Sequence, residues 1–324
     1  MRPRILLIGK NGQVGGELGR LLPYLGETVS LGRQELDLTD SLAIRRVLRD
    51  LRPNLIVNAA AYTAVDQAES NPEAASAINT DAPAVIAAEA KELGAVLVHY
   101  STDYVFDGDK KFPYEEADSP NPINVYGRTK LAGEQAIQEV GLPHLIFRLE
   151  WVYATRGKNF LLTILRLATQ REELRIVDDQ VGAPTWSRTI ALATMRILDR
   201  VCSPGLKISR IEEFSGIYHL TATAQTTWYG FAQAILEECA AAKDPDPWLP
   251  LATAGKPLVC QRVLPIATSD YPTPARRPPY SLLSNAKLRR VFGIELPDWR
   301  TQLRMVFDKV RADDAENGSL TQTG

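Results

Sequence analysis

The stretch ILLIGKNGQVG at residues 5–15 decides the fold class of this chain. Its apolar half predicts a buried strand, and the pattern after it predicts an amphipathic helix over Gly15–Leu25. Gly9 at the strand end permits a tight turn, Gly12 lets the backbone approach a pyrophosphate, and Gly15 lets the helix pack closely on the sheet. The helix N-terminus would present N–H groups and a partial positive charge to phosphates. A dinucleotide-binding turn is therefore predicted, with a turn that needs glycine only for packing as the alternative.

Short apolar runs alternate with helical periodicity through the first half of the chain. The predicted strands are Ile5–Ile8, Thr28–Leu31, Leu55–Asn58, Val96–Tyr100 and Leu145–Arg148. The helical segments between them are Gly15–Leu25, Ser41–Leu51, Asn71–Leu93 and Tyr126–Val140. Strands that are apolar on both faces and separated by helices indicate a parallel sheet covered on both sides. Right-handed crossovers then make the fold a doubly wound, Rossmann-type α/β sheet.

The second half changes character, with more tryptophan and clustered proline. We expect residues 1–149 to form the dinucleotide-binding domain, rejoined by about residues 173–225, where Gly216–Leu220 would add a strand. A smaller α+β substrate domain would comprise residues 150–172 and 226–311. Terminal helices are predicted over Leu282–Phe292 and Trp299–Val310, and residues 312–324 form a polar tail that we expect to be disordered.

Composition excludes several classes of function. The 324 residues carry a formal net charge of −2, which favours neither a nucleic-acid nor a membrane partner. The three cysteines, Cys202, Cys239 and Cys260, lie far apart and have no metal-ligand spacing. The apolar run near the N-terminus is too short for a secretory or membrane segment. These features predict a soluble cytoplasmic protein.

Tyr126 and Lys130 are the leading catalytic candidates. Their four-residue spacing places both side chains on one face of a helix. Tyrosine is a weak acid, with an unperturbed pKa of about 10. A nearby ammonium favours the phenolate and would lower that pKa. The same spacing also occurs on solvated helix surfaces, so the pair needs support from elsewhere in the sequence.

That support comes from the residues that follow the predicted strands, because the carboxyl ends of parallel strands line the ligand crevice. Thr102 comes just after Val96–Tyr100, and its hydroxyl would hydrogen-bond the phenol or a substrate oxygen. The stretch at residues 58–62, NAAAY, has small side chains where a flat cofactor would lie. Trp151 follows Leu145–Leu149 and is suited to pack on a sugar or nicotinamide face, with a core tryptophan as the alternative.

The end of the second strand bears on which cofactor is bound. NAD-selective sites usually place an acidic residue there, and this chain has Leu31-Gly32-Arg33 instead. Arg33 is suited to pair with a 2′-phosphate, which favours NADPH with NADH also possible; a solvated arginine is the alternative. Asp37 and Leu38 would flank the adenosine.

Six stretches together resemble the extended short-chain dehydrogenase/reductase family, and within it the dTDP-4-dehydrorhamnose reductases. They are GKNGQVG at 9–15, RPNLIVNAAAYTAVDQAE at 52–69, HYSTDYVFDG at 99–108, NVYGRTKLAGE at 124–134, DDQVGAPT at 178–185 and YPTPARRP at 271–278. The first and fourth occur throughout the superfamily, whereas STDYVF, DQVGAPT and YPTPARRP are specific to the reductases.

The resemblance implies NAD(P)H-dependent reduction of the C4 ketone of dTDP-4-dehydro-L-rhamnose. Tyr126 would protonate the C4 oxygen, Lys130 would tune it and hold the nicotinamide ribose, and Thr102 would assist. Implied cofactor contacts are Gly12, Gln13, Val14, Asp37, Leu38, Ala61, Tyr62, Thr63 and Tyr100. Implied contacts to the deoxysugar are Asp103 and Trp151, and weaker candidates for the nucleotide or diphosphate are Asn159, Gln180 and Arg277.

The chain also departs from the family pattern. Glu150 stands where relatives carry serine, which leaves open a different nucleotide-linked 4-keto sugar. Some relatives bind magnesium through glutamates at a dimer interface. Glu17 matches one such position, but the others match Arg188 and Arg300, so we expect no magnesium and either a monomer or a homodimer held by ion pairs. A non-catalytic binding subunit, like that of methionine adenosyltransferase, is the alternative from another class.

Overall fold

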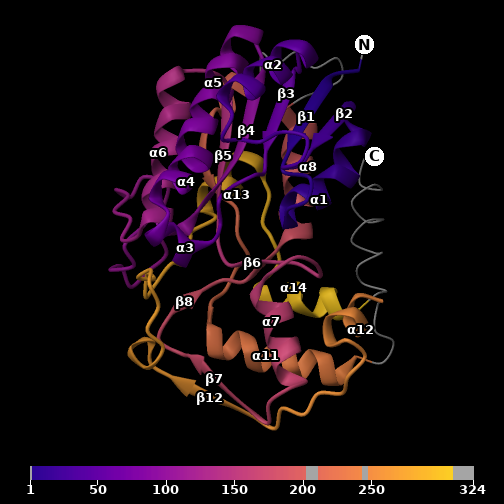
Figure 1. Ribbon diagram of the computed structural model, residues 1–324, viewed down its shortest axis with the longest axis vertical. Coiled ribbons are helices and arrows are strands. Elements are labelled where there is room, and N and C mark those ends of the chain that lie inside the picture. Colours follow the sequence, from indigo (N-terminus) through magenta and orange to yellow (C-terminus); the bar gives the residue numbers. More distant parts are fainter. Residues whose placement is uncertain (1, 202–210, 243–246, 309–324) are drawn as a thin grey trace. The chain divides into compact units, whose positions relative to one another are not determined.

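The computed structural model describes residues 2–201, 211–242 and 247–308. The chain divides into two compact units (Figure 1). Unit 1 comprises Met1–Glu150, Ser187–Thr221 and Thr273–Leu296. Unit 2 comprises Trp151–Trp186, Ala222–Pro272 and Pro297–Gly324.

Unit 1 is built on a parallel sheet, and its six strands have the order β10-β5-β4-β3-β1-β2 within the described residues. The strands are β1 (Arg4–Ile8), β2 (Glu27–Leu31), β3 (Leu55–Asn58), β4 (Val96–Thr102), β5 (His144–Leu149) and β10 (Gly216–His219). The order runs outward in both directions from β1, so the sheet is doubly wound. The expected return of Gly216–Leu220 to the main sheet is confirmed, because β10 pairs with β5.

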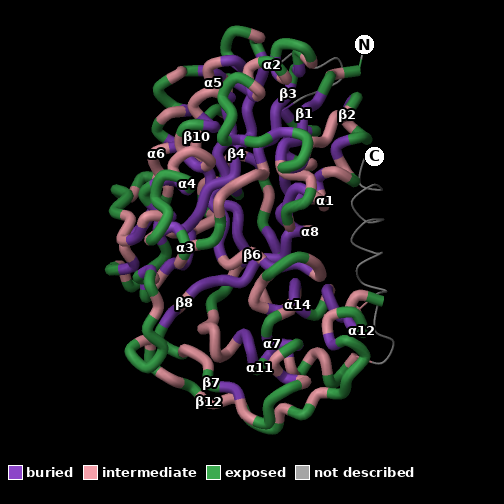
Figure 2. The backbone as a smooth tube through the Cα atoms, viewed as in Figure 1, coloured by how far each residue is buried: buried purple, intermediate pink, exposed green. Residues whose placement is uncertain are grey.

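Helices cover both faces of this sheet, as Figure 1 shows. On one face α2 (Ser41–Leu51), α5 (Ala82–Leu93) and α6 (Val125–Val140) pack in sequence, and on the other α1 (Gln13–Leu21) packs against α8 (Ser187–Val201). The first face encloses an apolar core that joins Ile44, Ile86 and Ile137 to the strands. Figure 2 shows β3 and β4 buried along their length, which explains why each begins with an apolar run, at residues 55–57 and 96–98.

The long helix expected over Asn71–Leu93 is interrupted. The structure has α3 (Val65–Ser70), α4 (Pro72–Ser76), a π-turn at Ala77–Asp81 and then α5. Within the π-turn, the buried Asn79 side chain accepts from Tyr62 N (2.8 Å) and donates to Tyr62 O (3.1 Å). The π-turn thus places the Asn79 amide where it fixes the loop after β3. Turns of this kind are frequent at functional sites.

The terminal helices are shorter than expected. Only α13 (Ala286–Phe292) forms within the predicted Leu282–Phe292, because the residues before it are extended and bridge Tyr114. Tyr114 N donates to Leu282 O, and Ser284 N donates to Tyr114 O, each at 2.8 Å. The last helix among the described residues is α14 (Trp299–Phe307). Val310 and the tail at 312–324 lie outside the described residues, as does Cys202.

Unit 2 has a core of helices with short strand pairs. Its elements are β6 (Val152–Tyr153), α7 (Phe160–Ala168), β7 (Glu173–Val177), β8 (Val181–Gly182), β9 (Thr185–Trp186), β11 (Thr226–Thr227), α11 (Trp228–Ala241), α12 (Trp248–Thr253), β12 (Arg262–Ile266), η5 (Thr268–Asp270) and α14. The remaining elements of unit 1 are η1 (Leu22–Tyr24), η3 (Asp103–Val105) and α10 (Ile211–Phe214).

The two units differ from the expected division by a few residues at Glu150 and at Ala222, and by two longer segments. Residues 173–186 belong to unit 2, because β7 pairs with β12 and Leu174 is buried in the core of that unit. Residues 273–296 belong to unit 1, where Leu283 packs with Phe106 and Tyr114. Both segments follow long-range pairings that local sequence patterns do not encode.

Candidate active site

The glycine turn lies where the strand order reverses, between β2 and β3. Gly9 has φ +93°, and a Cβ there would lie 2.7 Å from Ala60 N, so a side chain would collide with the end of β3. Gly12 N donates to Gly9 O (2.9 Å), and Gly12 O accepts from Gly16 N (3.0 Å), so Gly12 is the N-cap residue of α1, which starts without a side-chain cap. A Cβ on Gly15 would meet the Gly9 carbonyl. The turn therefore brings the start of α1 to the carboxyl edge of the sheet, as the sequence predicts.

Gly9→Ala should be far more costly than Gly94→Ala. Gly94 also has positive φ (+64°), at the end of α5, but a Cβ there meets nothing within 4 Å. The left-handed backbone alone costs a non-glycine residue about 1–2 kcal/mol, so Gly94→Ala should lose about that much. Gly9→Ala adds the collision with β3, and urea denaturation should show at least twice the loss. Equal losses would contradict this account of the turn.

Lys130 is buried at the carboxyl end of β4. Its Nζ donates to Tyr100 O (2.6 Å) and lies 3.1 Å from His99 Nε2, and the other ring nitrogen of His99 lies 3.2 Å from Asn58 Nδ2. Burial lowers the pKa of Lys130 to about 8. Burial and the Lys130 charge together hold the pKa of His99 well below its usual value, so His99 is neutral. The Lys130 ammonium thus contacts β4 directly and β3 through His99.

Tyr126 lies beside Thr102 and Asp103. Its side chain is buried, with the Tyr104 ring edge-on at 5.6 Å. Burial raises the pKa of Tyr126 to about 12, and a hydrogen bond with Thr102 lowers it by less. Thr102 Oγ1 donates to Asp103 Oδ1 (2.9 Å), and burial raises the pKa of this carboxyl to about 6.

The structure differs from the expectation that Lys130 lowers the pKa of Tyr126. Lys130 directs its ammonium at Tyr100 O and His99, and burial dominates at the phenol. Tyr126 therefore holds its proton throughout the neutral range. Thr102 is the residue that favours the phenolate, by hydrogen bonding.

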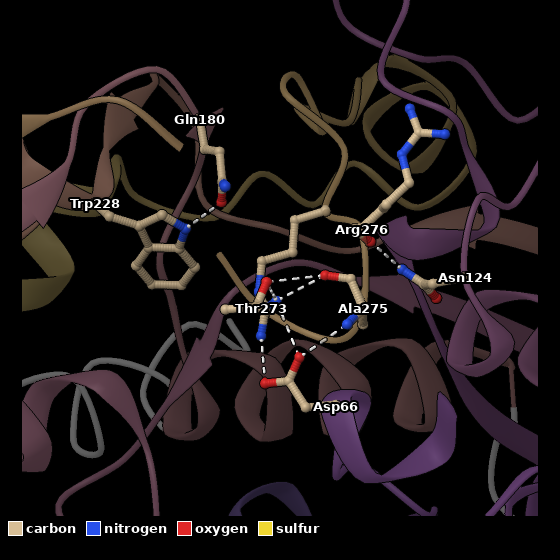
Figure 3. Close-up of polar contacts among 8 residues, drawn as sticks. Asp66, Asn124, Gln180, Trp228, Thr273, Ala275 and Arg276 are labelled. Atoms are coloured by element: carbon tan, nitrogen blue, oxygen red, sulfur yellow. Dashed lines mark hydrogen bonds and ion pairs between the residues drawn. The ribbon is translucent and has the colours of Figure 1, made fainter. Parts of the chain in front are cut away.

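Two side chains fix the start of α6, which carries Tyr126. Asn124 Oδ1 accepts from Gly127 N (2.8 Å), and Glu69 Oε1 accepts from Val125 N (2.7 Å). The amide of Asn124 also donates to Arg276 O (2.8 Å), as Figure 3 shows. The helix N-terminus is thereby tied to the segment at residues 273–277.

Asp66 organises that segment from α3. Its carboxylate accepts from both terminal nitrogens of Arg277, at 3.1 and 2.8 Å, and from Ala275 N at 3.2 Å. Arg277 also donates to Thr273 Oγ1 and to Ala275 O. Its partners Asp66, Thr273 and Ala275 are labelled in Figure 3. Arg277, expected as a diphosphate candidate, thus shapes its own loop. Asp66 was missed by sequence reasoning because its partner lies 211 positions away.

In unit 2, Trp151 stacks on Trp228. The ring centroids are 3.6 Å apart and the planes differ by 9°. Trp228 Nε1 donates to Gln180 Oε1 (3.1 Å; Figure 3), and Gln180 Nε2 donates to Thr268 Oγ1 (3.0 Å). Trp151 has φ +40°, a conformation that is costly for a bulky residue and is often kept at functional sites. Trp228 thus contacts two residues that were predicted separately, Trp151 and Gln180, although its own sequence position carried no signal.

Several predicted contact residues have structural roles. The Tyr100 phenol bonds Thr194 Oγ1 (2.8 Å) in the interior, so only its carbonyl is directed at Lys130. Asn159 caps α7 by accepting from Leu162 N (3.1 Å). Leu38 is buried in the apolar core of unit 1. Glu150 is buried and accepts from Ser281 Oγ (3.3 Å), so this departure from the family pattern lies in the interior of unit 1.

Other predicted residues lie on the loops around the sheet edge. Arg33 and Asp37 are exposed after β2, and the Asp37 carboxylate accepts from Thr39 N and Oγ1, each at 2.9 Å. Gln13 and Val14 open α1, and the loop after β3 holds Ala61, Tyr62 and Thr63.

The positions considered for a metal or dimer contact take part in other interactions. Glu17 lies 3.6 Å from Arg20, and Arg300 pairs with Glu237 (2.6 Å) and Glu238 (3.2 Å) within unit 2. Arg188 lies at the start of α8. Over the ranges that the structure covers, no group of three metal-ligating side chains gathers, and no helix is long and apolar enough to cross a bilayer.

Comparison with known proteins identifies the family of the chain. The family model described as the RmlD substrate binding domain matches residues 2–312. A dTDP-4-dehydrorhamnose reductase of Burkholderia thailandensis is 50% identical, over 92% of this chain and 95% of the relative. The Escherichia coli K12 enzyme of the same name is 42% identical, over 94% and 97%.

Similar solved structures carry the same enzyme name as these relatives. A dTDP-4-dehydrorhamnose reductase from Bacillus anthracis, in complex with NADP, superposes with a TM-score of 0.81 at 32% identity and covers 95% of this chain and 99% of its own. A Clostridium acetobutylicum dTDP-4-dehydrorhamnose reductase gives 0.82 at 34% identity, with the same coverage. The chain therefore belongs to the RmlD substrate binding domain family, the family of the dTDP-4-dehydrorhamnose reductases.

Proposed function

We propose that this chain reduces the C4 ketone of dTDP-4-dehydro-L-rhamnose to give dTDP-L-rhamnose, with NADPH as the reductant. The observation that carries the proposal is the buried Tyr126 beside Thr102, at the carboxyl edge of a sheet whose switch point holds the glycine turn. The family of the chain and the names of its relatives support this choice of substrate.

The residues present fit a dinucleotide. Gly9 and Gly12 themselves carry no side chains, so a pyrophosphate can approach the backbone at the start of α1. Arg33 is exposed near the end of β2, where the adenosine end of a dinucleotide lies in this fold class. Lys130 has an ammonium suited to the ribose hydroxyls. When bound, the nicotinamide supplies the hydride.

Tyr126 then supplies the proton. A pKa of about 12 keeps the phenol protonated at neutral pH, which is the form that an acid catalyst of ketone reduction requires. As C4 gains the hydride, the phenol O–H bond breaks and the proton passes to the C4 oxygen, so the ketone becomes a secondary alcohol. The Thr102 hydroxyl, which donates to Asp103 while the phenol is intact, would turn its proton to the phenolate that remains and stabilise it. Solvent protons restore the phenol for the next cycle.

The affinity for NADPH should fall as pH rises through about 8. Lys130 carries its charge below its pKa of about 8 and is neutral above it, so its attraction for the cofactor weakens at higher pH. Fluorescence titration of NADPH between pH 6 and about pH 10 tests this, with Lys130→Met as the matched variant. The variant should bind more weakly at low pH and lose this transition. An unchanged transition in Lys130→Met would contradict the assignment.

The substrate is tested by following NADPH oxidation on addition of dTDP-4-keto-6-deoxy-L-lyxo-hexose. We expect rapid oxidation with this sugar and at least about tenfold lower kcat/KM with a 4-keto sugar on another nucleotide. Turnover of only the other sugar would favour the different substrate that Glu150 left open. NADPH binding without turnover of any sugar would favour a non-catalytic binding protein.

A further inference from the structure

An ion pair links the glycine turn to the end of β2. Lys10 Nζ lies 2.6 Å from Glu35 Oε1, and the second carboxylate oxygen of Glu35 accepts from Gly32 N at 2.9 Å. Both side chains are partly exposed, at 34% for Lys10 and 43% for Glu35. The pair is thus fixed by a backbone contact yet remains open to solvent and to a ligand.

The surrounding backbone holds this pair in one place. Gly9 N and Lys10 N both donate to Leu31 O, at 2.8 and 3.2 Å. A Cβ on Gly32 would lie 2.6 Å from the Asn11 side chain, so Asn11 packs directly on Gly32. The turn and the end of β2 form one corner, and in this fold class the ribose of the adenosine lies at that corner.

Glu35 takes the place of the acidic residue that the end of β2 lacks. In NAD-selective proteins an acid about 20 residues beyond the glycine motif bonds the ribose hydroxyls, and Glu35 follows Gly15 by about that distance. Gly32 has no side chain, and the Glu35 carboxylate folds back to its N–H. The contacts with Lys10 and Gly32 N hold the pKa of Glu35 below its usual value, so the group is an anion.

Lys10 and Glu35 would have opposite effects on the binding of a 2′-phosphate. Lys10 and Arg33 would attract the phosphate of NADPH, whereas the Glu35 carboxylate would repel it and accept a hydrogen bond from the 2′-hydroxyl of NADH. While Glu35 holds Lys10, part of the attraction of Lys10 for a phosphate is cancelled. The balance of the three side chains then allows both cofactors to bind.

We propose that the Lys10–Glu35 ion pair sets the cofactor selectivity of this chain, with Glu35 admitting NADH and restraining Lys10 from the 2′-phosphate of NADPH. The proposal rests on the proposed function only in placing a dinucleotide at the glycine turn. It assigns to Lys10 and Glu35 the discrimination that Arg33 alone was expected to provide.

The test is the affinity for two fragments that differ only in the 2′-phosphate, 2′,5′-ADP and 5′-AMP, measured by isothermal titration calorimetry. NADPH and NADH are titrated in parallel. Glu35→Gln should raise the ratio of 2′,5′-ADP to 5′-AMP affinity about tenfold, because a charge of the same sign as the phosphate is removed and Lys10 is released from its ion pair. Lys10→Met should lower the same ratio by about tenfold.

Glu27→Gln is the matched control. It removes the same charge from the other end of β2, on an exposed side chain, and should leave the ratio unchanged. A ratio that Glu35→Gln leaves unchanged, while both fragments still bind, would overturn the proposal and leave the proposed function standing. Absence of NADPH binding to the unmodified protein would instead refute the proposed function and this inference together. Thermal melting of each variant verifies that it is folded.

Discussion

Tyr126→Phe should lower kcat by about three orders of magnitude, since a positioned general acid contributes about 10²–10⁴-fold. The phenol is the acidic group beside Thr102, and its pKa of about 12 keeps it protonated for the reduction. The ring remains, so its packing against Tyr104 is retained. The Kd for NADPH should change by less than about twofold, because the glycine turn and Lys130, the proposed cofactor contacts, are left in place. Steady-state kinetics and fluorescence titration measure the two quantities.

Tyr218→Phe is the control for this substitution. It also deletes one phenolic oxygen from a buried tyrosine of unit 1, but this hydroxyl donates to Phe214 O (2.8 Å) beside the edge strand β10. Its kcat should stay close to that of the unmodified protein. If Tyr126→Phe kept most of its activity, Tyr126 would not be the proton donor. The buried carboxyl of Asp103, with a pKa of about 6, would be the next candidate.

Breaking the buried ion pair between Arg148 and Glu134 should destabilise the protein by about 3–5 kcal/mol. The Arg148 side chain in β5 donates through Nε (3.0 Å) and Nη2 (2.6 Å) to the Glu134 carboxylate on α6. Both side chains are at most 2% exposed. Glu134→Ala would leave an arginine charge buried without its carboxylate partner. Because α6 also carries Tyr126 and Lys130, kcat should fall along with stability.

Two further variants separate the cost of a lone buried charge from the value of the pair. The double variant Arg148→Met with Glu134→Leu should recover much of the lost stability, since apolar replacements of buried pairs are often near neutral. The exposed pair of Arg289 and Glu295 is the surface control, and Glu295→Ala should cost less than about 1 kcal/mol. Urea denaturation measures the free energy of unfolding of each variant. A Glu134→Ala loss as small as the surface value would contradict the account of this pair.

Local backbone requirements made the glycine turn and the sheet predictable. Gly9 needs positive φ beside Ala60, and buried strands such as β4 begin with apolar residues on both faces, so sequence and structure correspond closely there. The spacing of Tyr126 and Lys130 likewise predicts that both lie on α6, and they do. The spacing does not predict where the ammonium points, because His99 and the Tyr100 carbonyl come from a different element.

Features that depend on distant residues were not predictable in this way. Arg277 was a diphosphate candidate by residue type, and only the fold reveals that Asp66 occupies its guanidinium. Trp228 stacks on Trp151 from a separate helix of unit 2. Glu35 is an intermediate case. Its distance of about 20 residues from the glycine motif fits the acidic residue of an NAD site, but Arg33, in the same loop, fits a 2′-phosphate by residue type and was chosen instead.

The transfer of deuterium from NADPH to the sugar tests the central claim most directly. NADPH that carries deuterium at the reactive nicotinamide carbon is incubated with the protein and dTDP-4-keto-6-deoxy-L-lyxo-hexose, and the sugar product is analysed by NMR and mass spectrometry. We expect the label on C4 of a dTDP-linked 6-deoxyhexose with the rhamno configuration. Oxidation of NADPH that leaves the sugar without label, or a label on another carbon, would contradict hydride transfer to the C4 ketone.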